Sequence, residues 1–369
     1  MDAELSRRHA NVRRAAQGAG LDALIVAGSE YTGFDGAVRY LSGFRIVHRY
    51  AYVLIPAQGE ATILFPSEAR YVGEHATAQL DQVFAEHPGA WLGEQVRGRR
   101  VGVYGLDHVM AVRDFRALQD AAAEVVPFDV EFDLARAAKS AAELDSVRDS
   151  IRINEEGFRV LVGGFEPGKT EAELLAPVEA LFVERGCGRS TMNMMLGGEP
   201  GPQATEFRLA SATRRVGAGE LLLPSLEIAG PGGHWVEASR PLGTVDAESE
   251  QMLETYCGYF EAASRALAAG KSAHDVHRTV SACFTGSGYE LGHVTGHSIG
   301  MTMIEHPRIG DGVETELETG MIISMHPHMM SADRNRCFFM QDTWLVGATG
   351  GQRLSTLRVK VYGSAEPAG

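Results

Sequence analysis

Residues 292–300 read Gly292-His293-Val294-Thr295-Gly296-His297-Ser298-Ile299-Gly300, and this stretch decides the fold together with a second one. The second reads Glu318-Thr319-Gly320-Met321-Ile322-Ile323-Ser324-Met325-His326-Pro327-His328. Glycines flank the first pair of histidines, as in tight turns, whereas an apolar run typical of a buried strand leads to the second pair. Histidines gathered beside turns and a strand in this way indicate a functional site.

The chain of 369 residues is too long for one compact core, so we expect two domains. Helical spacing near residues 3–18 is followed by short apolar runs at 21–27, 50–55, 61–65 and 101–105, which predict strands, and by a predicted helix at 110–123. This alternation is typical of an α/β unit, which we expect to end near Phe132.

The pattern changes after residue 138. Ser140 followed by Glu143 predicts a capping box at the start of a helix that runs to about Val162, and Thr170 predicts the cap of a helix through Glu184. Helical patterns at 247–269 and 273–285 flank strand-rich segments at 219–229, 320–326 and 342–347. This mixture predicts an α+β domain with a curved antiparallel sheet backed by helices.

These motifs resemble the creatinase, prolidase and aminopeptidase P family, whose catalytic domain has the pita-bread fold. Residues 296–300 are similar to the family's GHGxG motif, 320–327 to its GMVxSxEP strand, 139–148 to the entry of its catalytic domain, and 20–44 to its N-terminal domain. The resemblance covers nearly the whole chain. It implies an α/β N-terminal domain over residues 1–133 and an α+β pita-bread catalytic domain over residues 134–369.

The metallopeptidases of that family bind two metal ions with two aspartates, one histidine and two glutamates. The resemblance places Glu227 and Glu237 at the aspartates, His297 at the histidine, and His326 and Gln341 at the glutamates. Hard divalent ions need several carboxylates, and these last two replacements remove two negative charges. We therefore expect a metal-independent site without a cofactor. If a metal does bind, Glu227, Glu237, His297 and His326 are the expected ligands.

Creatinase is the metal-free branch of the family, and residues 315–327 are similar to it. Residues 227–230 are similar to a segment of ectoine hydrolase. This resemblance implies a hydrolase that cleaves a C–N bond of a small carboxylated amidine, guanidine or amide by His/Glu acid–base chemistry. Arg208 stands nearest to the place of the catalytic histidine of creatinase, so creatinase activity in the strict sense is not expected.

The candidates for catalysis are His326, His297, His293 and Glu305. Imidazole titrates near neutral pH and can act as either acid or base. His326 ranks first because the resemblance puts it where the family aims a side chain at the substrate. Glu305 could orient an imidazole or accept a proton, whereas a structural turn role is the alternative for His293.

The candidates for substrate binding are Arg240, Glu227, Glu237, Gln341, Arg308, His328 and Arg49. Arg240 and Arg308 could each bind a carboxylate through paired hydrogen bonds, although Arg308 could instead cover apolar surface. His328 shares a face with His326 only if the strand continues past Pro327. Arg49 resembles a basic position that one creatinase subunit lends to its partner, which implies a homodimer.

The family resemblance implies a small-molecule substrate, and composition excludes other classes of partner. The net charge of -14 argues against nucleic acid, because a phosphate-binding face needs a basic patch. Four cysteines without a CxxC pair predict free thiols and, with an N-terminus unlike a signal peptide, a cytoplasmic protein. No apolar run has the length of a membrane span, so no membrane association is expected.

Two other functions remain open. A metal-dependent pita-bread peptidase or lyase with altered ligands would contain bound metal and lose activity in chelators. A non-catalytic pita-bread protein that holds peptides or proteins would bind a ligand without turning it over.

Overall fold

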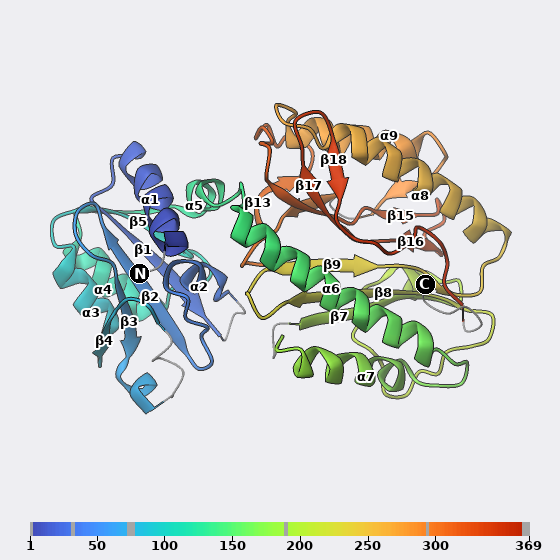
Figure 1. The fold of residues 1–369 in the computed structure, drawn as a ribbon, viewed down its shortest axis with the longest axis horizontal. Coiled ribbons are helices and arrows are strands. Elements are labelled where there is room, and N and C mark those ends of the chain that lie inside the picture. Colours follow the sequence, from blue (N-terminus) through green and yellow to red (C-terminus); the bar gives the residue numbers. More distant parts are fainter. Residues whose placement is uncertain (1–2, 31–33, 72–77, 188–190, 293–294, 364–369) are drawn as a thin grey trace. The chain divides into compact units, whose positions relative to one another are not determined.

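The computed structural model describes residues 3–30, 34–71, 78–187, 191–292 and 295–363. The chain divides into two compact units, Met1–Arg136 and Ala137–Gly369 (Figure 1). The first unit extends three residues beyond the boundary expected from the sequence. Arg136 belongs to it because its guanidinium pairs with Asp133 at 2.7 Å and donates to the Tyr104 hydroxyl at 3.1 Å.

The N-terminal unit is a six-stranded mixed sheet in the order β4-β3-β2-β1-β5-β6. Its strands are β1 (Ala23–Ser29), β2 (Tyr50–Pro56), β3 (Thr62–Pro66), β4 (Asp81–Ala85), β5 (Arg100–Tyr104) and β6 (Glu124–Pro127). Its helices are α1 (Ala3–Gly18), α2 (Gly36–Ser42), α3 (Pro88–Gln95), α4 (Val112–Ala121), α5 (Asp129–Ala135) and the short 3-10 helix η1 (Ser67–Tyr71).

Helices cover both faces of this sheet. Strand β1 is buried along its whole length, so it reads as a continuous apolar run. Its residue Ile25 shares one core with Leu92 of α3 and Leu118 of α4. On the opposite face, Gly28 lies so close to Val38 of α2 that an added Cβ would come within 2.6 Å of it. The predicted α/β domain is therefore confirmed.

The C-terminal unit has the α+β pita-bread architecture predicted from the sequence. Its helices are α6 (Ala141–Gly164), α7 (Glu171–Glu184), α8 (Ala247–Ala266), α9 (Ala273–Thr285) and the short 3-10 helix η3 (Pro202–Thr205). The first group of strands is β7 (Thr191–Gly198), β8 (Leu221–Ala229), β9 (Trp235–Ser239) and β10 (Leu242–Gly243). The second is β12 (Gly296–Ser298), β13 (Glu305–Ile309), β14 (Ile322–Met325), β17 (Asp342–Val346) and β18 (Gly351–Arg353). The third is β11 (Glu290–Leu291), β15 (His328–Met330) and β16 (Cys337–Phe339).

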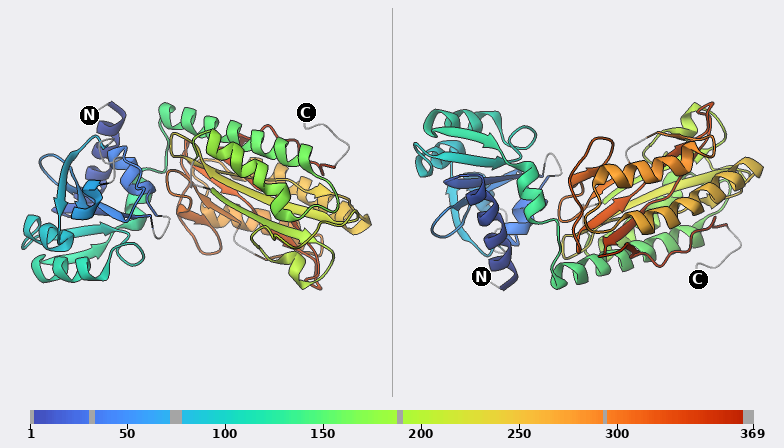
Figure 2. Two further views of the ribbon diagram at one scale, coloured as in Figure 1. Left: turned by 90° about the horizontal axis from the view of Figure 1, so that it is seen from below. Right: turned by 90° about the horizontal axis from the view of Figure 1, so that it is seen from above.

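Each larger sheet of this unit is backed by its own pair of helices (Figures 1 and 2). Residues of α6 and α7 form one apolar core with β8 and β9, whereas residues of α8 and α9 form another with β14 and β17. The two sheets meet where Ser239, at the end of β9, bridges to Gln341, just before β17. One continuous surface therefore runs across both sheets between the helix pairs.

The predicted helix caps are present. The Ser140 side chain accepts from the Glu143 N–H at 3.1 Å and the Glu143 carboxylate accepts from the Ser140 N–H at 2.9 Å, which completes the capping box of α6. Thr170 caps α7 in the same way.

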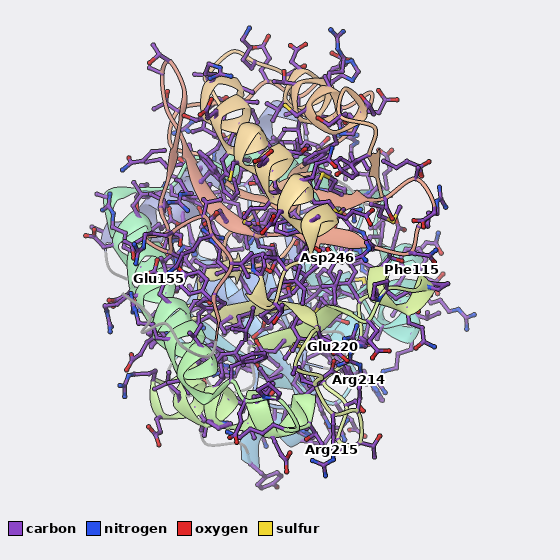
Figure 3. All side chains as sticks on the ribbon, turned by 90° about the vertical axis from the view of Figure 1, so that its right-hand side faces the viewer. Phe115, Glu155, Arg214, Arg215, Glu220 and Asp246 are labelled. Carbon is purple, nitrogen blue, oxygen red and sulfur yellow. The ribbon has the colours of Figure 1, made fainter. Side chains whose placement is uncertain are left out.

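Buried Glu171, the first residue of α7, ties that helix to the loop before β8. Arg208 pairs with it at 2.7 Å and Arg214 at 3.1 Å. Arg214 also pairs with Glu220, and both residues are labelled in Figure 3. Arg208 is thus held by this cluster of charges. The four cysteines are free thiols, and among the described residues no helix is both long and apolar enough to cross a membrane.

Candidate functional site

A cavity of about 250 Å³ opens on the inner surface of the C-terminal unit. Its lining combines apolar walls with a polar floor and comprises Met192, Met194, Phe207, Glu227, Glu237, His297, Met303, Ile304, Arg308, His326, Phe339 and Gln341. Sequence reasoning named the polar members, but missed Phe207, Ile304 and Phe339. Ring contact between Phe207 and Phe339, whose centroids lie 5.2 Å apart, builds one wall of the cavity.

Strand pairing brings the two glutamates of the floor together. Glu227 of β8 and Glu237 of β9 are direct partners across the antiparallel pair. Opposed residues project to the same face of a sheet, so both carboxyls enter the cavity. Like charges at this spacing repel, and each carboxylate consequently needs its own compensating partners.

Glu237 is compensated by the histidines. Its Oε1 lies 3.4 Å from Nε2 of His297, while its Oε2 accepts from the Ser324 hydroxyl at 2.5 Å. Burial alone would raise the pKa of Glu237, but His297 and His326 lower it to about 2. Burial would likewise lower the pKa of His297, yet the facing carboxylate holds it above its ordinary value.

The His297 ring is fixed in orientation by the backbone. Its Nδ1 lies 2.9 Å from the carbonyl oxygen of Ser298, so Nδ1 carries the proton that is donated there. Nε2 consequently points into the cavity toward Oε1 of Glu237, and it offers a lone pair there when the ring is neutral. The His326 ring lies 5.0 Å from the His297 ring, and ligand atoms of His297, His326 and Glu237 all lie within 4.8 Å of one another.

Glu227 stands outside that cluster. Its Oε1 lies 2.9 Å from Nε2 of Gln341 and 2.8 Å from Oγ of Ser225, whose oxygen is also 2.7 Å from Oε1 of Gln341. One hydroxyl has one proton, and the amide oxygen of Gln341 can only accept it. The contact between Ser225 and Glu227 therefore fits a protonated carboxyl. Burial, and then Glu237, raises the pKa of Glu227 to about 8.

Arg308 is the basic residue that lines the cavity. It pairs in register with His297 across β12 and β13, and its side chain is exposed. Among the described residues it has no acidic partner within ion-pair distance. Its guanidinium therefore remains available to an anionic group of a ligand.

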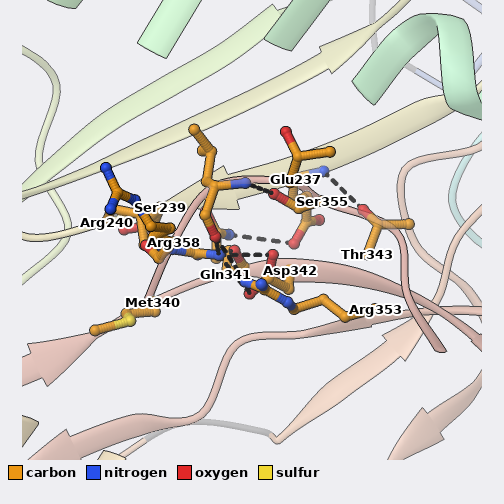
Figure 4. Close-up of polar contacts among 12 residues, drawn as sticks. Glu237, Ser239, Arg240, Met340, Gln341, Asp342, Thr343, Arg353, Ser355 and Arg358 are labelled. Atoms are coloured by element: carbon orange, nitrogen blue, oxygen red, sulfur yellow. Dashed lines mark hydrogen bonds and ion pairs between the residues drawn. The ribbon is translucent and has the colours of Figure 1, made fainter. Parts of the chain in front are cut away.

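Arg240 does not line the cavity, contrary to the prediction of substrate binding. It is fully buried, and its guanidinium makes two hydrogen bonds to Asp342 at 2.8 and 3.0 Å (Figure 4). Both of these bonds come from Nη2, which also lies 3.1 Å from the carbonyl oxygen of Leu357, while Nη1 donates to the carbonyl oxygens of Ser239 and Gln341 and Nε to that of Arg358. These bonds occupy all its donors, so Arg240 holds strands together.

Glu305 also lies away from the cavity lining. Its Oε2 pairs with Nζ of Lys139 at 3.0 Å, and its Oε1 accepts from the Thr302 N–H at 3.2 Å. A buried carboxylate that is committed in this way has no path to the substrate. The expected catalytic role of Glu305 is replaced by an ion pair that anchors the start of the unit.

His328 and His326 do not share a face. Strand β14 ends at Met325, and His328 begins β15 in a different sheet, because Pro327 interrupts the ladder. His326 lines the cavity, whereas His328 packs against the rings of Phe207 and Phe339, with centroid distances of 5.6 and 6.1 Å.

The remaining predicted residues cannot be assigned to the cavity. His293 lies outside the described residues. Arg49 belongs to the N-terminal unit, where Nη1 lies 3.5 Å from the Glu68 carboxylate.

Sequence reasoning also missed two serines. Ser225 contacts the Glu227 carboxyl from two residues earlier on β8, and Ser324 of β14 donates to the Glu237 carboxylate. The period of two along β8 was the available signal for Ser225, since it sets this residue on the same face as Glu227. Ser324 lies directly opposite His297 across β12 and β14, a pairing that only the folded sheet reveals.

Comparison with known families gives two matches. Residues 145–348 match the model of metallopeptidase family M24, and residues 8–138 match the model of the creatinase/prolidase N-terminal domain. Together they cover both units of the chain.

Among curated proteins, the probable dipeptidase PepE of Mycobacterium tuberculosis is 26% identical over 343 residues, which are 88% of each chain. An uncharacterized peptidase of Bacillus subtilis, YqhT, is 25% identical over 211 residues, and the match spans 58% of its length. The structure of a prolidase from Thermococcus sibiricus superposes with a TM-score of 0.83 at 20% identity, covering 98% of this chain and 99% of that one. At that identity the superposition supports the fold.

These matches confirm a hydrolase of C–N bonds, but the prediction of a metal-independent, creatinase-like enzyme is wrong. The matching model describes metallopeptidases, and the relatives have peptidase names. The prediction counted the charges lost at His326 and Gln341. It gave the lost charges more weight than the alternative ligand set that included His326, and the folded chain brings this imidazole beside His297 and Glu237.

Proposed function

Because the chain belongs to metallopeptidase family M24, we propose that it is a metal-dependent peptidase acting on small peptides. The observation that carries this proposal is the convergence of Glu237, His297 and His326 at the floor of the cavity, with ligand atoms within 4.8 Å of one another. Three buried donors, from the middle of β9, the middle of β12 and the residue that follows β14, meet there. No apolar packing requirement explains such a cluster.

The donors fit a transition-metal ion. Two imidazoles and one carboxylate form a ligand set of catalytic zinc sites, in which a fourth position stays open. The bond from Nδ1 of His297 to the Ser298 carbonyl presents Nε2 as the ligand atom, as in many metal sites. When bound, the ion would polarise the peptide carbonyl or activate water. Glu237 would use Oε1, because Ser324 and Gln341 donate to Oε2.

The cavity supports a small substrate with a free carboxylate. Its volume of about 250 Å³ accommodates a peptide of a few residues, and its apolar walls suit an apolar side chain. The guanidinium of Arg308, which has no acidic partner in the described part of the chain, can form paired hydrogen bonds with a terminal carboxylate. The dipeptidase name of the mycobacterial relative agrees with this substrate class.

Glu227 is the group that we propose to move a proton. It lines the cavity, lies outside the cluster of metal donors, and accepts at Oε1 from the Gln341 amide. In its carboxylate form, a carboxyl placed beside the scissile bond can take a proton from water, and in its protonated form it can give that proton to the leaving amine. Ser225 and Gln341 would hold that carboxyl in place.

A chelator experiment tests the proposal. Protein stripped of metal is assayed for release of amino acids from dipeptides with apolar residues, before and after addition of Zn²⁺ or Mn²⁺. We expect activity to fall by on the order of 100-fold or more on stripping and to return with the ion, since a metal supplies several kcal/mol of transition-state stabilisation. Circular dichroism controls for unfolding. Full activity in stripped, folded protein would overturn the proposal.

A further inference from the structure

Gln341 is held at the seam between the two larger sheets. Its N–H and its carbonyl both exchange hydrogen bonds with Ser239, each at 3.3 Å, and its carbonyl also accepts from Arg240 at 3.0 Å. The side chain is 2% exposed. A backbone fixed on both sides leaves the amide one direction to point, which is into the floor of the cavity.

The amide lies between the two glutamates. Its Nε2 donates to Oε1 of Glu227 at 2.9 Å and to Oε2 of Glu237 at 3.2 Å. The opposite orientation of the amide would set its oxygen against both carboxyls. The Ser225 hydroxyl, 2.7 Å from Oε1 of Gln341, supports the orientation with the nitrogen inward. The two N–H groups thus occupy the space between the paired carboxyls.

We infer that Gln341 restricts the site to a single metal ion. The inward N–H groups present partial positive charge to the oxygens that a second cation would need. A hard divalent cation placed between the two glutamates would displace the amide hydrogen bonds, and it would find no third carboxylate there to bind it. Oε1 of Glu237 would remain available to an ion beside His297, because the amide and Ser324 occupy Oε2. Gln341 is therefore a positioning residue as well as a barrier.

This inference rests on the proposed function, since it presupposes that Glu237, His297 and His326 bind a metal. The inference goes further than the proposed function because it specifies how many metal ions bind. A carboxylate at position 341 would join Glu227 and Glu237 in a group of three, which is the composition that divalent cations prefer. Gln341→Glu should consequently create a second site next to the first.

The test is metal titration of chelator-stripped protein with Mn²⁺ by isothermal calorimetry, checked by metal analysis after gel filtration. We expect about one equivalent per wild-type chain and about two for Gln341→Glu, since adjacent ions share bridging carboxylates. The matched control is Gln352→Glu, the same change at an exposed position of β18, which should stay at about one equivalent. Electron paramagnetic resonance adds an independent readout, because two neighbouring Mn²⁺ ions couple magnetically and an isolated ion does not.

The outcomes separate the two ideas. Absence of any bound ion in the wild type defeats the proposed function, and the inference with it. Two ions in the wild type overturn the inference and leave the proposed function standing. One ion in both the wild type and folded Gln341→Glu likewise overturns the role of Gln341. If the variant does not fold, the wild-type stoichiometry decides, with one ion in support and two against.

Discussion

Nε2 of His297 lies 3.4 Å from Oε1 of Glu237, and both side chains are buried. A hydrogen bond to the Ser298 carbonyl fixes the orientation of the imidazole, and a hydrogen bond from the Ser324 hydroxyl fixes that of the carboxylate. Buried charged groups are retained at a cost unless they are compensated. Here they point, with His326, at one place on the cavity floor, so the arrangement serves a ligand more directly than it serves stability.

Glu237→Gln should weaken metal binding by at least about 100-fold, because even partners that only orient a ligand contribute 10–100-fold to affinity. Competition with a chelating dye measures the change. The matched control is Glu261→Gln on the exposed side of α8, which should bind as the wild type does. Unchanged affinity in Glu237→Gln would remove this residue from the ligand set.

Arg308→Met should raise KM for dipeptides roughly 10–100-fold, since a hydrogen bond to a charged group is worth about 1.5–3 kcal/mol. The KM for substrates with an amidated C-terminus should change little, because these substrates have no carboxylate for Arg308 to bind. Steady-state kinetics on paired free-acid and amide substrates measure the difference, with Arg265→Met on α8 as the control. Equal effects on both substrates would argue against carboxylate recognition.

Glu227→Gln should lower kcat by about 10²–10⁴-fold while changing KM and metal content little, because the amide keeps the shape of the carboxyl but cannot transfer a proton. Kinetics combined with metal analysis of the same preparation test this. Loss of metal from the folded variant would instead make Glu227 a ligand, as the alternative set from the sequence proposed.

Arg240→Met should destabilise the protein by about 3–5 kcal/mol, because it leaves the carboxylate of Asp342 buried without its main partner. Denaturant unfolding of the metal-free protein measures this free energy. A raised KM in a variant of unaltered stability would return Arg240 to the substrate site.

Local chemistry explains which features were predictable from the sequence. The capping box of Ser140 and Glu143 and the strand of apolar residues before His326 depend on neighbours in the chain, so their patterns identified them. The cavity positions of His297 and Glu237 followed from motif resemblance. Such features need no knowledge of distant contacts.

Other features depend on contacts between distant segments. The Gln341 amide meets Glu227 and Glu237 across more than a hundred residues of chain, and Arg240 meets Asp342 in the same way. A sequence motif shows that an arginine is present. The pairing of β9 with the segment before β17 decides whether its guanidinium faces solvent or pairs with a carboxylate. The sequence shows that Pro327 can interrupt a strand. It does not show that His328 then joins a second sheet.

The most direct test of the central claim is anomalous diffraction at the zinc edge from crystals of Zn²⁺-loaded protein. The account predicts an anomalous peak bound by Nε2 of His297, Oε1 of Glu237 and a ring nitrogen of His326, at about 2.0–2.2 Å from each. The absence of a peak at the cavity floor, or a peak held by other residues, would contradict it.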